Sequence, residues 1–240
     1  MRLKLVFSYD GSAFLGSASQ PHLNSVQDAL AAALAHLGIF SPVLFASRTD
    51  KGVHALRAVA CVECGEHFKD LVYLKRQINR FAHPFIHIKS LERVSENYAV
   101  RFDVRVREYR YIFHHGEFNP FLSRYVCFSE RFDIKRANEL LSHFVGEKDF
   151  KFFQKAGGSA KTSIRTMFMA KAYTHKNLSV FQFRANGFLR AQIRLSVASV
   201  MAVLRGELSE DKLKEQIEAK ACHYRLLAPA NGLYLSRIIY

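Results

Sequence analysis

The chain has no tryptophan, only four cysteines and five prolines in 240 residues, and no long apolar run. Four cysteines are too few for a disulfide scaffold, and the Cys61-x-x-Cys64 pair has no second Cys or His pair to complete a zinc site. No segment approaches the roughly eighteen apolar residues of a membrane span, and the alternating amino terminus lacks the apolar core of a signal peptide. We therefore expect a cytoplasmic protein with reduced thiols, no metal and no membrane partner.

Acidic residues are also scarce. The 35 Lys and Arg residues against 21 Asp and Glu residues give a formal charge of +14 with neutral histidines. Such an excess favours nucleic acid as the partner, because no basic amphipathic helix of the membrane-binding kind is present. The glycine-rich phosphate loops of nucleotide hydrolases and dinucleotide enzymes are missing, and so is the RNP1 string of an RNA-recognition motif.

The hydrophobic pattern predicts one topology twice. In the first half we expect strands at 3–9, 43–47, 57–64 and 85–94 and helices at 25–38 and 70–81; in the second, strands at 107–113, 164–175, 178–185 and 233–239 and helices at 133–145, 189–204 and after Ser209. This order predicts an α+β fold of two ferredoxin-like (β-α-β-β-α-β) halves. Their sheets would join into a larger, mostly antiparallel sheet with helices on one side. We expect a half at 1–98 that carries an aspartate loop and a half at 99–240 that carries a tyrosine strand.

The segment Arg48-Thr49-Asp50-Lys51-Gly52-Val53-His54 connects two apolar, strand-like runs. It predicts a tight turn in which Gly52 can take a positive φ. One interpretation is an ordinary solvated turn. Alternatively, Asp50 is a nucleophile that stays ionised because Arg48 and Lys51 supply positive charge. A single local acid does not fit the paired carboxylates of a glycosidase, and a lone His54 is more typical of a ring that satisfies a backbone group.

Two further segments carry candidate binding residues. On a strand, Tyr109 and Tyr111 share one face, which fits either a core pair or a platform on which a nucleobase stacks. Arg190 and Arg194 lie four residues apart along a predicted helix. They are either the polar edge of a packed helix or, for Arg194, a partner for a carboxylate such as Asp50.

Read together, these fragments resemble the TruA family of tRNA pseudouridine synthases over nearly the whole chain. Ser47-Arg48-Thr49-Asp50-Lys51-Gly52-Val53-His54 is similar to the family's Gly-Arg-Thr-Asp-Ala-Gly-Val-His signature. The other matching fragments occur in the family's order: Tyr9-Asp10-Gly11, Ser25-Val26-Gln27, Ala99-Val100-Arg101-Phe102, Arg107-Glu108-Tyr109-Arg110-Tyr111, Gly146-Glu147-Lys148-Asp149-Phe150, Ile164-Arg165-Thr166, Asn186-Gly187-Phe188-Leu189 and Gly232-Leu233-Tyr234-Leu235.

The resemblance implies a homodimeric, cofactor-free isomerase of uridines 38, 39 and 40 in the tRNA anticodon stem-loop. Asp50 would be the nucleophile, Tyr109 would stack on the target base, Arg48 would hold the flipped nucleotide and Arg194 would pair with Asp50. The implied RNA contacts are Tyr98, Arg101, Phe102, Arg165 and Thr166. Whether Asp50 attacks the ribose, attacks the base or first generates a glycal stays open, as does the choice among the three tRNA positions.

The chain also departs from the family pattern. Ser17 stands where Trp commonly follows the glycine, Ser47 where Gly is usual and Lys51 where bacterial members have Ala; Phe152 and Ala198 replace a usual Ser and Gly. These departures bear on substrate range and positioning rather than on the reaction. The alternative hypothesis is a basic RNA-binding or RNA-folding module that keeps the scaffold without the chemistry.

Overall fold

The computed structural model describes residues 1–158 and 160–240. The chain forms two compact units: unit 1 comprises Met1–Arg105 and Tyr234–Tyr240, and unit 2 comprises Val106–Leu233. The predicted halves divided the chain once, after residue 98. The observed units divide it after Arg105 and again before Tyr234, because the last strand hydrogen-bonds to a strand of unit 1.

Unit 1 is built on a sheet in the order β4-β1-β3-β10. Its strands are β1 (Arg2–Tyr9), β2 (Leu44–Phe45), β3 (His54–Glu63), β4 (Ile86–Val94) and β10 (Leu233–Ile239). β1 pairs antiparallel with both β3 and β4. Two strands pair with the edge of β3 that lies away from β1. The two residues of β2 pair antiparallel with Cys61 and Ala60, and β10 pairs in parallel with His54 and Ala55. The Asp50 turn therefore leads into a strand that is bonded on both edges.

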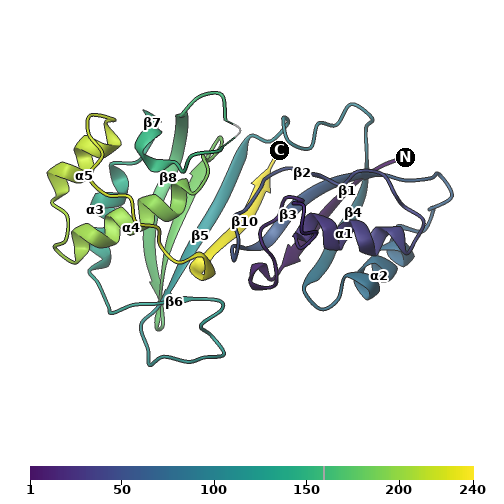
Figure 1. Cartoon of the computed structure of the whole chain (residues 1–240), viewed down its shortest axis with the longest axis horizontal. Coiled ribbons are helices and arrows are strands. Elements are labelled where there is room, and N and C mark those ends of the chain that lie inside the picture. Colours follow the sequence, from purple (N-terminus) through teal and green to yellow (C-terminus); the bar gives the residue numbers. More distant parts are fainter. Residues whose placement is uncertain (159) are drawn as a thin grey trace. The chain divides into compact units, whose positions relative to one another are not determined.

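The helices of unit 1 begin at the side chains that cap them. α1 (Val26–Ala35) starts after Ser25, which forms a capping box with Asp28, and α2 (Leu71–Ala82) starts after Asp70, whose carboxylate accepts from the Tyr73 amide. α1 and α2 pack against each other, and α2 also contacts β4 (Figure 1). The core beneath them includes Leu3, Leu5 and Phe7, which alternate along β1 as a half-buried strand requires.

Unit 2 has a four-stranded antiparallel sheet in the order β5-β9-β8-β7. Its strands are β5 (Val106–His114), β6 (Cys127–Phe128), β7 (Gly146–Asp149), β8 (Ile164–His175) and β9 (Leu178–Ala185). β6 adds two parallel pairs to β5. Phe113 and Phe181 meet in the core with ring centroids 5.0 Å apart.

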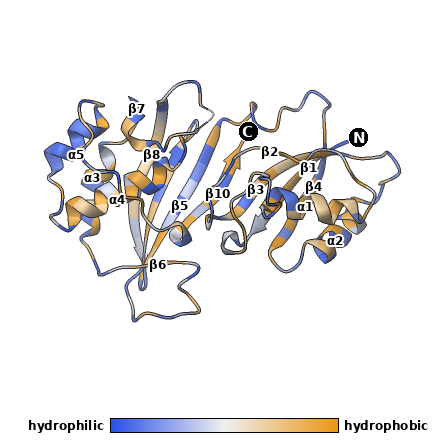
Figure 2. Ribbon diagram, viewed as in Figure 1, coloured by the Kyte–Doolittle hydropathy of each residue, from blue (hydrophilic) through white to orange (hydrophobic). Residues whose placement is uncertain are grey.

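Three α-helices complete unit 2: α3 (Ile134–Ser142), α4 (Gln192–Leu204) and α5 (Glu210–Ile217). α3 packs on β8 and on α4, and the more hydrophilic α5 packs on α4 (Figure 2). Three short 3-10 turns, Gly11–Ala13, Lys151–Phe153 and Ala230–Gly232, complete the described elements. The mixed α/β class, the element order of both halves and the mostly antiparallel strands confirm the predicted fold class.

Candidate active site

Asp50 lies in the connection between β2 and β3, as the sequence predicts. Gly52 has φ +78, and the Val53 amide donates to the Asp50 carbonyl oxygen at 3.2 Å, which closes a tight turn. The Asp50 side chain is half-buried. A rigid strand begins four residues later at His54, so the turn holds this carboxylate on a firm support.

Thr49, immediately before Asp50, is fixed by segments from elsewhere in unit 1. Its side-chain oxygen lies 2.7 Å from the hydroxyl of Tyr9 at the end of β1. Its amide donates to the Ser17 hydroxyl oxygen at 2.7 Å, and its carbonyl accepts from the Ser17 amide at 3.1 Å. Neither Tyr9 nor Ser17 carries an obvious reactive group, so the sequence did not indicate that they hold this turn; the Tyr9-Asp10-Gly11 motif was the available signal.

Gly11, the last residue of the Tyr9-Asp10-Gly11 motif, lies against the end of the Asp50 turn. A Cβ built on Gly11 would lie 2.0 Å from the carbonyl oxygen of Val53, so only glycine allows this approach to the end of the Asp50 turn. The Gly11 amide donates to Nδ1 of His54 at 3.1 Å.

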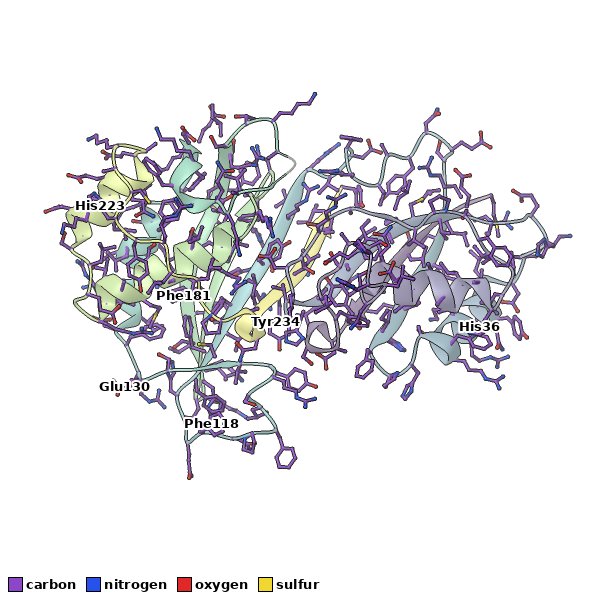
Figure 3. The ribbon with its side chains drawn as sticks, viewed as in Figure 1. His36, Phe118, Glu130, Phe181, His223 and Tyr234 are labelled. Carbon is purple, nitrogen blue, oxygen red and sulfur yellow. The ribbon has the colours of Figure 1, made fainter. Side chains whose placement is uncertain are left out.

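His54 is a structural ring. It is 2% exposed and stacks on Tyr234 of β10 with centroids 4.8 Å apart; Tyr234 is labelled in Figure 3. Asp10 Oδ1 lies 3.3 Å from the same Nδ1. Because Nδ1 accepts from the Gly11 amide, it carries no proton in this arrangement, and we interpret its contact with Asp10 as a close approach rather than an ion pair. His54 thus satisfies a backbone group, as the sequence favours.

The two cations beside Asp50 both point to the surface. Arg48 and Lys51 are exposed, and within residues 1–158 and 160–240 their side chains make no hydrogen bond or ion pair. The sequence predicts that Arg48 and Lys51 supply positive charge to Asp50, but among the described residues neither side chain forms an ion pair with its carboxylate. Both side chains are available to an anionic ligand.

Tyr109 lies on β5 in unit 2, opposite Phe183 of β9. It is only 6% exposed, and its ring meets Phe188 edge-to-face at 5.2 Å. The sequence left both a core position and a stacking platform open for this ring. The structure buries it, because Phe188, from the loop before α4, packs against the ring. Its neighbour Glu108 is 1% exposed and bound by Arg184 at 2.6 Å and by Arg110 at 3.2 Å, which fixes this part of β5.

Arg194 lies in the first turn of α4. Its Nε donates to the Ala228 carbonyl at 2.7 Å, and the Ala228 amide donates back to the Arg194 carbonyl at 3.1 Å. The guanidinium is half-buried and therefore oriented by the segment that precedes β10.

The predicted RNA-contacting residues fall into two groups. Phe102 is 85% exposed and Arg101 is also exposed, whereas Tyr98 is half-buried beside Tyr240 and burial raises its pKa to about 12.

In unit 2, Arg165 bonds to the carbonyls of its own segment, and burial lowers the pKa of its guanidinium. The Thr166 backbone pairs with Asn186 in both directions, at 3.1 Å each. Arg101 and Phe102 are the members best exposed to a ligand.

No group of three or more His, Cys, Asp or Glu side chains within 1–158 and 160–240 is placed to hold a metal ion. No helix in the same residues has the length and apolar character needed to cross a membrane.

Comparison with known proteins identifies the class. A family model described as tRNA pseudouridine synthase matches residues 140–240. The tRNA pseudouridine synthase A of Campylobacter jejuni strain 81116 is 63% identical over 240 residues, which cover 100% of both chains. The proteins of that name from Wolinella succinogenes and Helicobacter hepaticus are each 39% identical, covering 97% and 99% of this chain and 92% and 98% of theirs.

Similarity of this extent shows that the chain is an isomerase that acts on tRNA. It therefore favours an enzyme over a non-catalytic RNA-binding module. The chain belongs to the TruA family of tRNA pseudouridine synthases.

Proposed function

We propose that the protein isomerises uridine to pseudouridine at positions 38, 39 and 40 of the tRNA anticodon stem-loop, with Asp50 as nucleophile and without a cofactor. The N-glycosidic bond breaks, the base turns, C5 joins the ribose carbon and the hydrogen on C5 leaves while N1 gains one. No atom is added overall, so the reaction requires no external reagent. The target nucleotide must leave its stack, because its glycosidic atoms are inaccessible within a helix.

The held conformation of the Asp50 turn is the observation that carries this proposal. Thr49 is bound through its side chain by Tyr9 and through its backbone by Ser17, and Gly11 packs directly on Val53. A nucleophile gains most from a fixed orientation, because a misplacement of about 1 Å can cost about 100-fold in rate. An ordinary solvated turn has no need for so many constraints.

The remaining site residues are assigned by their matches to the family pattern. Tyr109 stacks on the target base, Arg48 holds the flipped nucleotide and Arg194 is the cationic partner of Asp50. The exposure of Arg48 supports its role, since a cation that has no ion-pair partner among the described residues can bind a phosphate. The bond from Arg194 to Ala228 supports an oriented guanidinium.

RNA also contacts Tyr98, Arg101 and Phe102 in unit 1 and Arg165 and Thr166 in unit 2. An exposed phenylalanine beside an arginine suits base stacking next to a phosphate contact. We further propose, from the family pattern, that the protein works in the cytoplasm as a homodimer.

The test is a map of pseudouridine in unmodified tRNA treated with the purified protein or with its Asp50→Ala variant. We expect pseudouridine at positions 38, 39 and 40 with the wild type and none with the variant, while both bind tRNA with similar affinity. Modification confined to other positions would overturn the proposed substrate site. An active Asp50→Ala variant would overturn the assignment of the nucleophile.

A further inference from the structure

Ser17 forms two hydrogen bonds with the backbone of Thr49. Its hydroxyl oxygen accepts from the Thr49 amide at 2.7 Å, and its own amide donates to the Thr49 carbonyl at 3.1 Å. The first bond holds the peptide group between Arg48 and Thr49, and the second holds the peptide group between Thr49 and Asp50. Both peptide planes that lead into Asp50 are therefore oriented by one residue.

The segment that carries Ser17 is itself hydrogen-bonded to α1. The Gly16 carbonyl accepts from the Val26 amide and the Ser17 carbonyl accepts from the Gln27 amide, both at 3.1 Å, in the first turn of α1. Gly16 has φ +123, and a Cβ there would lie 3.2 Å from the Thr49 carbonyl oxygen, so the two segments run in close contact. The position of α1 is thereby transmitted to the Asp50 turn.

Ser17 is also a place where the chain departs from the family pattern, in which Trp commonly follows this glycine. An indole N–H can only donate a hydrogen bond, so a tryptophan side chain cannot accept from the Thr49 amide. Ser17 is 0% exposed and cannot contact RNA in this conformation. Its hydroxyl therefore binds the backbone of Thr49 rather than the substrate.

We infer that Ser17 is a positioning residue for the isomerase reaction, which acts by fixing the backbone that presents Asp50. The inference rests on the proposed function, because it takes Asp50 as the nucleophile. A positioning role predicts a loss in turnover without a loss in tRNA affinity. A purely structural role predicts a loss of stability with normal turnover in the fraction that stays folded.

The test compares Ser17→Ala with Ser41→Ala under conditions where both are folded. Ser41 is the matched control, because its hydroxyl also accepts from a backbone amide of unit 1, that of Glu63 at 3.1 Å, at the opposite end of β3. We expect Ser17→Ala to lower kcat about 10- to 100-fold with KM within about threefold of the wild type. Ser41→Ala should keep both constants within about threefold.

Hydrogen exchange at the Thr49 amide gives a readout that does not depend on activity. It should be faster in Ser17→Ala than in the wild type and unchanged in Ser41→Ala. Faster exchange with wild-type kcat would overturn the positioning role, and so would equal losses of kcat in the two variants.

If Ser17→Ala does not fold, Ser17→Cys takes its place, since a thiol fills a similar volume but is a weak acceptor. A wild-type kcat in folded Ser17→Cys would overturn the inference, whereas a severalfold loss at unchanged KM would support it. Failure of the proposed function is a separate result, seen as an inactive wild type or an active Asp50→Ala variant.

Discussion

The close approach of Gly11 to Val53 makes a sharp prediction for Gly11→Ala. The added Cβ would lie 2.0 Å from the Val53 carbonyl oxygen and 2.4 Å from its carbonyl carbon, where contacts under 3.0 Å essentially do not occur. The atoms it meets are backbone, so no side chain can rotate away. The chain must move by about 1 Å, and we expect the free energy of unfolding to fall by about 3 kcal/mol or more.

The displaced segment would carry the Asp50 turn with it, because the Val53 amide bonds to the Asp50 carbonyl. We therefore expect kcat of the folded Gly11→Ala protein to drop about 100-fold. Urea unfolding measures the first effect and pseudouridine formation at saturating tRNA measures the second.

Gly38→Ala is the control for this prediction. Gly38 has φ +74 with nothing within 4 Å of a built Cβ, so alanine there introduces backbone strain without a collision. Its cost should be about 1–2 kcal/mol, with activity retained. A Gly11→Ala protein that is as stable as Gly38→Ala, or fully active, would refute the role assigned to the contact between Gly11 and Val53.

Three further predictions concern unit 2 and the exposed aromatic residue of unit 1. Tyr109→Phe keeps the ring and should retain most of the turnover, whereas Tyr109→Leu should lose about 1–3 kcal/mol of transition-state stabilisation in kcat/KM; equal turnover in the two variants would argue against base stacking. Glu108→Gln should lower the free energy of unfolding at pH 7 by about 1–3 kcal/mol. Burial raises the pKa of the Glu108 carboxyl, but hydrogen bonds from Arg184 and Gln182 and the charges of Arg184 and Arg110 outweigh burial and hold that pKa below 4.5. The stabilisation is thus fully present above pH 4.5. Urea unfolding should show the wild-type advantage disappearing as the pH falls through the lowered pKa, and an advantage that does not decrease at any acidic pH where both proteins still fold would contradict this. Phe102→Ala should leave stability within about 0.5 kcal/mol, since the side chain is 85% exposed, and weaken tRNA binding by about 1–3 kcal/mol; unchanged binding in a filter assay would remove Phe102 from the RNA surface.

Local patterns were sufficient to predict much of the fold. The strands at 164–175 and 178–185 match β8 and β9 because runs rich in aromatic and other strand-favouring residues flank a turn in which Lys176 takes φ +54. α2 and α3 begin directly after Asp70 and Asp133, whose carboxylates accept from first-turn amides. Such signals lie within a few residues of the structure that they specify.

The differences arise where tertiary contacts decide. β7 was not expected, because Gly146-Glu147-Lys148-Asp149 has little strand propensity and is extended only where it pairs with the edge of β8. α4 begins at Gln192 rather than near Leu189, because Ala191 has φ +62 and interrupts the helical backbone without a Gly or Pro to signal it. The return of β10 to unit 1 is a long-range pairing that no local pattern encodes.

The candidate site shows the same limit. The sequence located the Asp50 turn and the positive φ of Gly52, both of which depend on neighbouring residues. It did not indicate that Ser17 and Tyr9 hold Thr49, because these bonds span 32 and 40 residues of chain. It also placed Tyr109 on the correct strand without indicating that Phe188 would cover its ring.

The most direct test of Asp50 as nucleophile is the single-turnover release of tritium from tRNA labelled at C5 of uridine, with wild-type protein and the nearly isosteric Asp50→Asn variant. Release reports the reaction itself, because the hydrogen on C5 leaves as the new carbon–carbon bond is made. We predict that the variant binds tRNA within about threefold of the wild type and releases tritium at least about 10⁴-fold more slowly. Release by Asp50→Asn within about tenfold of the wild-type rate would contradict the assignment of Asp50.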